Sequence, residues 1–392
     1  MPYAYNAIKR LLPENGGFML IHVVQQGETI TSIANQYGLT PERIIIENEL
    51  PNADNLVVGQ SIVILYPEVV HTVVQGDTLY NIANTYGVEP VQILRNNPRI
   101  AATETLIPGE TIVIEYRPDE ETGGEKLGNL FINGYAYPFI DRSVLRKTLP
   151  FLTSLSIFTY GFTPEGDLNP IDDEELIQIA LEFDVAPVMV LAPMTADERF
   201  SNEIAHNMFI NPEGQNNLIN NIIANMKAKN YRGLDIDFEF VLPEDEQLFI
   251  SFIQNVHSRL QPEGFFVSVA LAPKTSSEQA GVLYTAHNYP VIGASVDYVL
   301  LMTYEWGYTF GPPMATAPVN NVRQVLEYGV SVIPPSKILM GIPNYAYDWP
   351  LPFVRGETAA ESIGNVEAII RAAENRVTIE FDPIAQAPFY YY

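Results

Sequence analysis

The segment from residue 231 to residue 240 places three carboxylates at alternate positions, Asp235, Asp237 and Glu239, among apolar neighbours. Alternate residues of a β-strand point to the same face, so these side chains would lie together. Three ionised carboxylates in one place repel one another strongly, and the lowest-cost state leaves at least one of them protonated. A carboxyl group with a raised pKa can donate a proton near neutral pH, so the spacing indicates general acid chemistry.

Two other interpretations of this segment are a solvated strand edge and a metal cluster. The intervening Leu234, Ile236 and Phe238 disfavour a solvated edge, because apolar side chains of this size belong in a core. A metal site would need further ligands, and the histidines of the chain show no ligand-like spacing. We therefore expect catalysis, with no metal and no cofactor.

The elements around the carboxylates alternate between apolar strand-like segments and amphipathic helical segments. This order is typical of a parallel sheet covered on both faces. Seven strands without a Gly-rich dinucleotide fingerprint favour an α/β fold of the TIM-type (β/α)8 barrel, with the last βα unit missing. The expected strands span residues 130–138, 155–162, 186–194, 231–240, 264–274, 297–306 and 337–349. Candidate substrate contacts where these strands meet one rim are Tyr135, Tyr160, Met302, Trp306, Asn344 and Tyr345.

The N-terminal part of the chain contains a repeat, in which the segment from His22 aligns with the segment from His71. Each copy is predicted as strand, helix, helix, strand. Thr29 and Thr78 suit helix N-caps, and the Gly that follows each first helix suits a left-handed helix end. We expect two small βααβ domains at residues 19–66 and 69–116.

Composition bounds the remaining possibilities. The chain of 392 residues carries 47 acidic and 21 basic residues, a formal net charge of −26, which disfavours nucleic acid and anionic membranes as partners. It has no cysteine, which excludes disulfides and thiolate chemistry. No recognisable signal peptide or membrane-spanning segment is present, and residues 1–18 suggest a leader or an added expression segment. A charged, Gly-rich linker at 117–128 precedes the expected barrel at 129–392.

The repeats resemble the LysM module, which binds N-acetylglucosamine polymers such as peptidoglycan and chitin. The resemblance rests on the matching "QGETI" and "QGDTL" turns, the "IAN" helices and the closing apolar strands. It implies a shallow sugar groove in each copy, and two sites on one chain would gain avidity. Taken singly, each position has the alternative of being a turn or cap residue. The implied glycan contacts are Gly27, Thr29, Ile30, Gly76, Asp77, Thr78, Leu79 and Ile107.

The segment "GLDIDFE" resembles the DxxDxDxE signature of family-eighteen glycoside hydrolases, and "LMTYEW" is similar to their M-x-Y motif. That resemblance implies Glu239 as general acid, the substrate's 2-acetamido group as nucleophile, and Asp237 as its partner. It implies that Asp235 shares a proton with Asp237 and that Tyr304 orients the acetamido carbonyl. Taken together with the repeats, this resemblance points to one branch of the family, the spore-germination N-acetylglucosaminidases that act on cortex fragments.

The sequence departs from the family pattern in three features. Arg232 replaces the first Asp of the signature, Glu305 stands where many members carry Asp or Asn, and the eighth strand with its floor tryptophan is missing. The expected function is a retaining, substrate-assisted β-N-acetylglucosaminidase on spore-cortex peptidoglycan, monomeric and associated with spore or cell wall. The alternatives are a chitinase and a catalytically silent peptidoglycan-binding protein.

Overall fold

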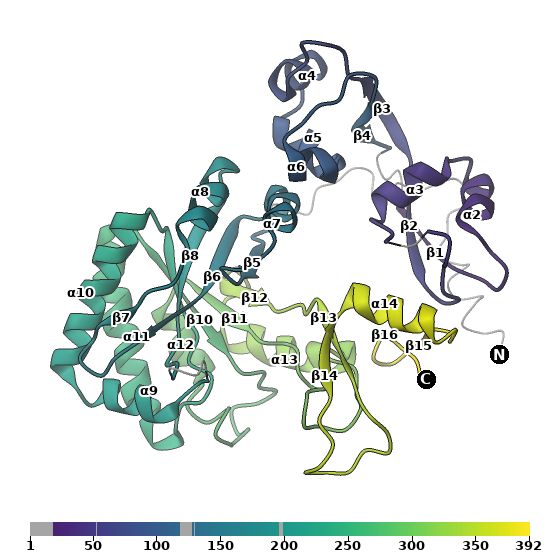
Figure 1. Cartoon of the computed structure of the whole chain (residues 1–392). Coiled ribbons are helices and arrows are strands. Elements are labelled where there is room, and N and C mark those ends of the chain that lie inside the picture. Colours follow the sequence, from purple (N-terminus) through teal and green to yellow (C-terminus); the bar gives the residue numbers. More distant parts are fainter. Residues whose placement is uncertain (1–18, 52, 118–127, 129, 196–198) are drawn as a thin grey trace. The chain divides into compact units, whose positions relative to one another are not determined.

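The computed structural model describes residues 19–51, 53–117, 128, 130–195 and 199–392 (Figure 1). The expected leader at 1–18 and most of the expected linker lie outside the described residues. The chain forms two compact units. The first contains the described residues up to Leu130 together with Asn344–Asp348 and Glu361–Tyr392, and the second contains Phe131–Pro343 and Trp349–Ala360.

The second unit is built on seven parallel strands, which run across the sheet in the order β12-β11-β10-β9-β8-β6-β5, with the short β7 pairing antiparallel with β6. Apart from β7, neighbours in the sheet are therefore also consecutive along the chain, as in a barrel. The strands are β5 (Asn133–Ala136), β6 (Ser154–Phe162), β7 (Leu168–Asn169), β8 (Ala186–Leu191), β9 (Gly233–Ile236), β10 (Phe266–Leu271), β11 (Tyr298–Leu301) and β12 (Ile338–Met340).

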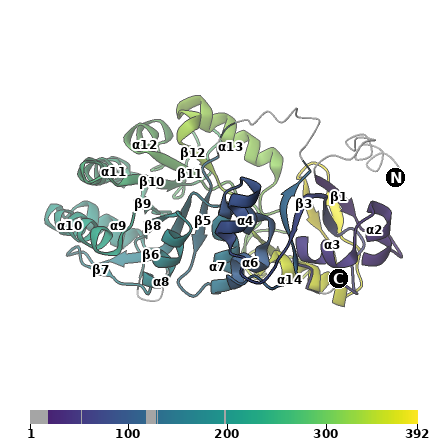
Figure 2. The same cartoon turned by 90° about the horizontal axis from the view of Figure 1, so that it is seen from above.

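Helices follow the strands and cover the outer side of the sheet, as Figure 2 shows for α10 to α13. They are α7 (Arg142–Thr148), α8 (Glu174–Glu182), α9 (Asn202–Phe209), α10 (Pro212–Lys229), α11 (Glu246–Leu260), α12 (Tyr289–Ser295) and α13 (Val319–Val332). The sheet curls: Phe131, just before β5, stacks on Tyr298 of β11 at 4.8 Å between ring centroids. The predicted α/β barrel architecture is confirmed, with no β12–β5 ladder among the described residues.

Strand β9 shows why its sequence alternates between apolar and acidic residues. Leu234 and Ile236 are fully buried in the core that the sheet shares with α10 and α11. Asp235, between them, points to the opposite face, inside the curled sheet, as period-two geometry requires. The apolar neighbours anchor β9 in the core, and the Asp235 carboxylate points into the interior of the curled sheet.

In the first unit, each repeat forms an antiparallel strand pair with helices between the strands. The caps expected from the sequence are confirmed: the hydroxyls of Thr29 and Thr78 accept from backbone N–H groups of their helices, and Gly38 and Gly87 adopt left-handed conformations. The first repeat contains β1 (Met19–Val23), α2 (Ile30–Tyr37), α3 (Pro41–Glu47) and β2 (Ser61–Leu65). The second contains β3 (Pro67–Thr72), α4 (Leu79–Tyr86), α5 (Pro90–Asn96), α6 (Pro98–Thr103) and β4 (Thr111–Tyr116).

The C-terminal segment corrects one expectation. The strand expected over 337–349 is wrong, because β12 ends at Met340 and Tyr345 begins a separate antiparallel strand. Pro343 lies between them and has no N–H to continue a ladder. The segment consists of β13 (Tyr345–Asp348), β14 (Glu361–Gly364), α14 (Asn365–Glu374), β15 (Glu380–Asp382) and β16 (Ala387–Phe389).

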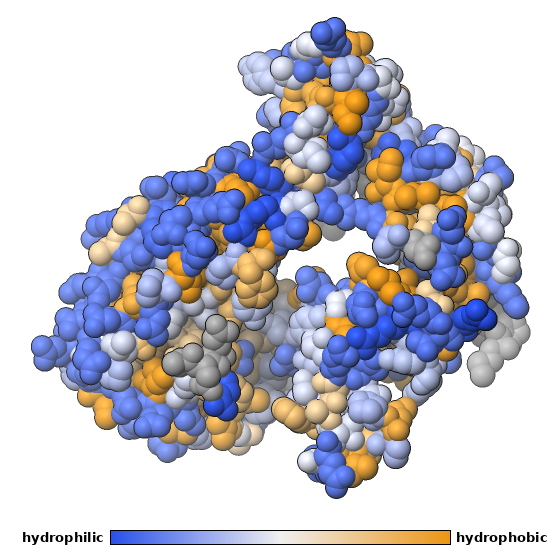
Figure 3. Space-filling view, viewed as in Figure 1, coloured by the Kyte–Doolittle hydropathy of each residue, from blue (hydrophilic) through white to orange (hydrophobic). Residues whose placement is uncertain are grey.

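The surface is mostly hydrophilic, with scattered apolar groups (Figure 3). Among the helices that the structure describes, none combines the length and the apolar character needed to cross a membrane.

Candidate active site

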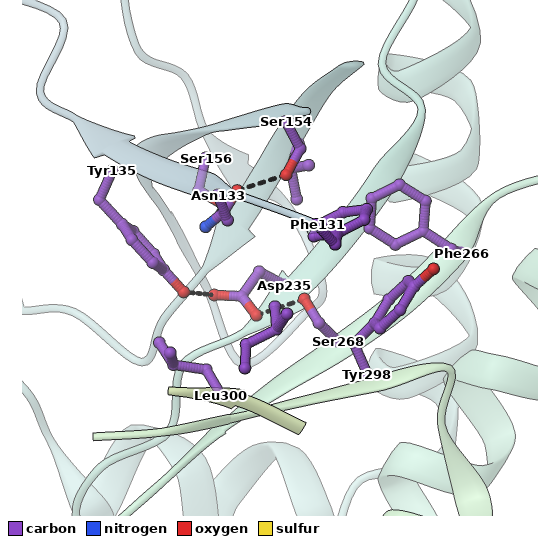
Figure 4. Close-up of a pocket in the computed structure, with 12 residues that line it drawn as sticks. Phe131, Asn133, Tyr135, Ser154, Ser156, Asp235, Phe266, Ser268, Tyr298 and Leu300 are labelled. Carbon is purple, nitrogen blue, oxygen red and sulfur yellow. Dashed lines mark hydrogen bonds between the residues drawn. The ribbon is translucent and has the colours of Figure 1, made fainter. Parts of the chain in front are cut away.

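Asp235 is held at the centre of the second unit by two hydroxyl groups. The Tyr135 hydroxyl donates to Oδ2 of Asp235 (2.7 Å), and Ser268 Oγ donates to Oδ1 (2.5 Å), as Figure 4 shows. Burial raises the pKa of Asp235, while the two hydrogen bonds oppose this rise. Both carboxylate oxygens of Asp235 are thus held in place by neighbours on β5 and β10.

A small cavity of about 10 Å³ lies beside Asp235. That volume is enough for about one water molecule. Its walls bring together residues from both ends of the sheet, including Asn133 of β5 and Leu339 of β12. Ser154 Oγ donates to Oδ1 of Asn133 (2.6 Å), and Asn133 Nδ2 donates to Ser156 Oγ (3.1 Å). The interior under the carboxylates is therefore polar and hydrogen-bonded.

Asp237 follows β9 directly, and its backbone N–H still donates to Leu191 O of β8 (3.0 Å). The side chain is buried, and its Oδ1 has no hydrogen-bond partner among the described residues. Burial, the charge of Glu239 and the charge of Asp235 together raise the pKa of Asp237 well above its usual range. A buried, unsatisfied carboxyl oxygen of this kind calls for a partner that the protein itself does not supply.

Glu239 is half-buried two residues further along the same loop. Burial, and next the negative charge of Glu305, raise the pKa of Glu239 to about 7. A general acid works best when its pKa lies near the working pH. Glu239 is therefore the carboxyl group best suited to donate a proton at neutral pH.

Tyr304 follows β11, and burial and the charge of Asp237 raise the pKa of its hydroxyl. Its ring packs against Gly341, where an added Cβ would lie 2.5 Å from Cε1 of Tyr304. The nearby Thr303 Oγ1 donates to Gly341 O (2.8 Å), which ties the end of β11 to the end of β12. Met302 is half-buried, and its backbone N–H donates to Leu271 O (3.0 Å).

An open cleft of about 470 Å³ adjoins Tyr304. This is a volume typical of ligand sites. Trp306 lines it, and so does Glu305, whose φ of +66° is unusual for a residue with a side chain. The remaining walls come from the loop after β10, an irregular segment that periodicity does not single out. These are Pro273, Thr275, Ser276, Glu278, Gln279 and Tyr284.

His287 supports the catalytic loop from behind and was not identified from the sequence. Ala272 N–H donates to its Nδ1 (2.8 Å), so Nε2 carries the proton that reaches the carbonyl of Phe238 (3.2 Å). Burial lowers the pKa of His287 to about 4, which keeps the ring neutral. Phe238 lies between Asp237 and Glu239, so this hydrogen bond positions the backbone that carries both.

The structure revises the roles of several candidate contacts. Tyr160 is 1% exposed, and its hydroxyl donates to Asp173 (2.5 Å). A side chain so enclosed supports the core, and this corrects the expectation that it contacts sugar. Tyr135 is bonded to Asp235 as described. Asn344 and Tyr345 belong to the first unit, at the start of β13.

The candidate residues of the repeats are mostly engaged in local structure. Asp77 accepts from Val74 N–H (2.7 Å) and bonds His71 (2.8 Å), and the His71 bond lowers the pKa of Asp77. Thr29 and Thr78 cap helices, and Ile30 is buried. Gly27 and Gly76 have left-handed φ angles with open space around them, Leu79 is half-buried and Ile107 is exposed. Within the described residues, no three His, Asp or Glu side chains are placed to hold a metal ion.

Comparison with known proteins gives this architecture a family. Residues 195–392 match the model of glycosyl hydrolases family 18, and residues 22–65 and 71–115 each match the LysM domain. The cortical fragment-lytic enzyme of Bacillus subtilis (strain 168) is 37% identical over 374 residues, which cover 95% of this chain and 86% of that protein. The chain is a glycoside hydrolase, and it belongs to glycosyl hydrolase family 18.

Solved structures agree with this assignment. The spore cortex-lytic enzyme SleL of Bacillus megaterium QM B1551 superposes with a TM-score of 0.76 at 38% identity, over 96% of this chain and 86% of that one. SleL of Bacillus cereus gives a TM-score of 0.77 at 34% identity, over 95% and 86% of the two chains. A chitinase from Chromobacterium violaceum, 20% identical with a TM-score of 0.61 over 67% of this chain and 82% of that one, shares the fold.

Proposed function

We propose that the chain is a retaining, substrate-assisted β-N-acetylglucosaminidase that degrades spore-cortex peptidoglycan, with LysM modules anchoring it on the polymer. The observation that carries the proposal is the pairing of a general acid, Glu239, with the buried and unsatisfied Asp237. The relatives named for cortex lysis support the choice of substrate. Because this substrate lies in the spore, we assign the protein to the spore cortex or cell wall. We also expect it to be a monomer.

The geometry supports the substrate's own acetamido group as nucleophile. A retaining scheme with two protein carboxylates needs an ionised nucleophile near the acid. Both oxygens of Asp235 are hydrogen-bonded to Tyr135 and Ser268, and the raised pKa of Asp237 favours its protonated form in the free enzyme. Neither group is a free ionised nucleophile, whereas an acetamido N–H offers Oδ1 of Asp237 the partner it lacks.

The reaction then proceeds in two steps. Glu239 gives its proton to the glycosidic oxygen while the acetamido carbonyl oxygen attacks the anomeric carbon, and the leaving sugar departs as an alcohol. Asp237 accepts from the acetamido N–H and stabilises the oxazolinium charge, while its proton passes to Asp235. The Tyr304 hydroxyl donates to the acetamido oxygen and holds it in line. Glu239, now ionised, removes a proton from water, which attacks the anomeric carbon and restores the acetamido group with net retention. The proton held by Asp235 then returns to Asp237, which restores the free enzyme.

The central test is Glu239→Gln, which keeps the shape of the side chain and removes only its titrating proton. We expect turnover of soluble cortex fragments to fall by about 10²–10⁴-fold, with an unchanged melting temperature. Activity within a few-fold of the parent enzyme would refute the assignment of the acid.

A second experiment separates the alternatives. Mass analysis of the products from cortex fragments and from chitin oligomers should show faster cleavage of cortex, with N-acetylglucosamine at the new reducing end. Faster cleavage of chitin would favour the chitinase, and no cleavage of either would favour the catalytically silent binding protein.

Because the proposed mechanism requires the acetamido group of the substrate, a plain glucoside should not be cleaved.

A further inference from the structure

The two LysM repeats differ in what covers the loop before their last strand. In the first repeat, Val57 is buried in an apolar cluster with Ala372 and Ile379. The backbone N–H of Ile379 donates to the carbonyl of Val58 (2.9 Å). Ile379 follows α14, so the C-terminal segment of the chain packs directly on the loop before the last strand of the first repeat.

A matched pair of glycines shows how close this packing is. A Cβ at Gly59 would lie 2.0 Å from the carbonyl oxygen of Ile379, so no larger residue fits there. The corresponding Gly109 of the second repeat has nearly the same φ, +92° against +89°, but nothing lies within 4 Å of its Cβ position. Ile107, the counterpart of Val57, is 50% exposed where Val57 is 4% exposed.

The residues around the open loop also differ between the repeats. Val74 and Tyr80 are exposed in the second repeat, where the first repeat has Gln25 and Thr31. Tyrosine combines an apolar ring with a hydroxyl, which suits the apolar faces and polar edges of a sugar. The second repeat therefore keeps both an open loop and a surface suited to glycans.

We propose that the second repeat alone binds the N-acetylglucosamine polymer, through Ile107, Tyr80 and the turn that begins at Gly76. The first repeat is instead a docking platform for the C-terminal segment of its own chain. A segment tethered to the same chain acts at a high effective concentration, so a weak glycan ligand cannot displace it from Val57. The inference rests on the proposed LysM anchoring and narrows it to one site.

The test compares Ile107→Ala with its counterpart Val57→Ala in the full chain carrying Glu239→Gln, so that the polymer is not cut. Co-sedimentation with insoluble peptidoglycan should give an apparent Kd raised about fivefold or more for Ile107→Ala, and likewise for Tyr80→Ala. Val57→Ala should change the Kd by less than about twofold while lowering the melting temperature by several degrees. Equal weakening by Val57→Ala and Ile107→Ala would overturn the inference, and so would no weakening by any variant.

Hydrogen exchange gives an independent readout that needs no destabilising variant. An N-acetylglucosamine tetramer should protect amides at 74–80 and 105–109 and leave 25–31 and 55–59 unchanged. Equal protection of both repeats would overturn the inference. Cleavage of soluble fragments by the chain with intact Glu239 is measured alongside, so a failure of the single-site inference is distinguishable from a failure of the proposed enzyme.

The docking is tested by Gly59→Ala against Gly109→Ala. Both substitutions impose the same left-handed strain, because the two φ angles nearly coincide. Only Gly59→Ala also clashes with Ile379, so its melting temperature should fall further. Equal falls would mean that the contact between the repeat and the C-terminal segment is absent in solution.

Discussion

At the scale of single residues, the site separates three carboxyl groups by their surroundings. Asp235 is hydrogen-bonded at both oxygens, Asp237 is buried with an unsatisfied oxygen, and Glu239 is half-buried. Like charges in a common low-dielectric site push their pKa values apart. These different surroundings support the three roles proposed for one motif: a support for Asp235, a partner of the substrate for Asp237 and an acid for Glu239.

The pH dependence should reveal the influence of Glu305 on the acid. Glu239 must be protonated to act, so kcat/KM should fall as pH rises through its pKa of about 7. Glu305→Gln removes a negative charge that favours the protonated form, and the basic limb should move to lower pH. The control is Glu278→Gln, a cleft carboxylate that does not contribute to the raised pKa of Glu239. A basic limb unmoved by Glu305→Gln, or moved equally by the control, would contradict the argument.

The substitutions Asp237→Asn and Asp235→Asn should change different kinetic properties of the enzyme. Losing the Asp237 charge removes stabilisation of the oxazolinium, which we expect to reduce kcat by about two to three orders of magnitude. Asp235→Asn should cost less, and should mainly move the acidic limb of the pH–rate profile, because it changes how the shared proton is partitioned. Steady-state kinetics across pH check both variants. A larger loss of kcat for Asp235→Asn would reverse the assigned roles.

At the scale of elements, the segments that follow three strands of one sheet position the candidate side chains. Asp237 directly follows β9, Tyr304 lies shortly after β11, and the residue after β12 is Gly341, which makes room for the Tyr304 ring. Behind them, His287 links the loop after β9 to the loop after β10. The chemistry therefore depends on backbone contacts between segments that lie far apart in the sequence.

Gly341→Ala tests this dependence. The added methyl group would meet Cε1 of Tyr304 at 2.5 Å and displace the ring that holds the acetamido oxygen. A misplacement of about 1 Å can cost about 10²-fold in rate, so we expect kcat to fall by about that factor in a folded protein. The control is Gly364→Ala, at a glycine with a φ of −72° and open space around it. Unchanged kinetics in Gly341→Ala would mean that the Tyr304 position is not critical.

At the scale of the whole molecule, the first unit combines the repeats with the C-terminal segment. The repeats are bonded to each other: the Tyr116 hydroxyl donates to Glu47 (3.0 Å), and Arg117 N–H donates to Tyr66 O (2.9 Å). The C-terminal segment adds the contact between Ile379 and the first repeat. Removing the repeats would therefore expose apolar surface elsewhere in the chain.

Deleting residues 1–117 should accordingly have two separable effects. Turnover of soluble fragments should stay within a few-fold of the full chain, because the catalytic residues all lie in the second unit. Binding to insoluble cortex should weaken, and limited proteolysis within 361–392 should become faster, since Ala372 and Ile379 lose the cover of Val57. Equal loss of activity on soluble and insoluble substrates would mean that the repeats form part of the active site.

Features that depend on local pattern could be predicted from the amino-acid sequence alone. Period-two spacing predicted the strand that carries the three carboxylates, and the alternation of strands and helices predicted the barrel. The internal repeat predicted two small domains with threonine caps and glycine ends, and their resemblance to a known family indicated LysM modules. Three features became visible only in the folded chain: Tyr160 lies in the core, Tyr135 and Ser268 hold Asp235, and the two repeats differ in exposure. Periodicity reports which face of an element is apolar. Which distant segment packs against that face depends on register and on the packing of the whole chain, and these are settled only when the elements assemble.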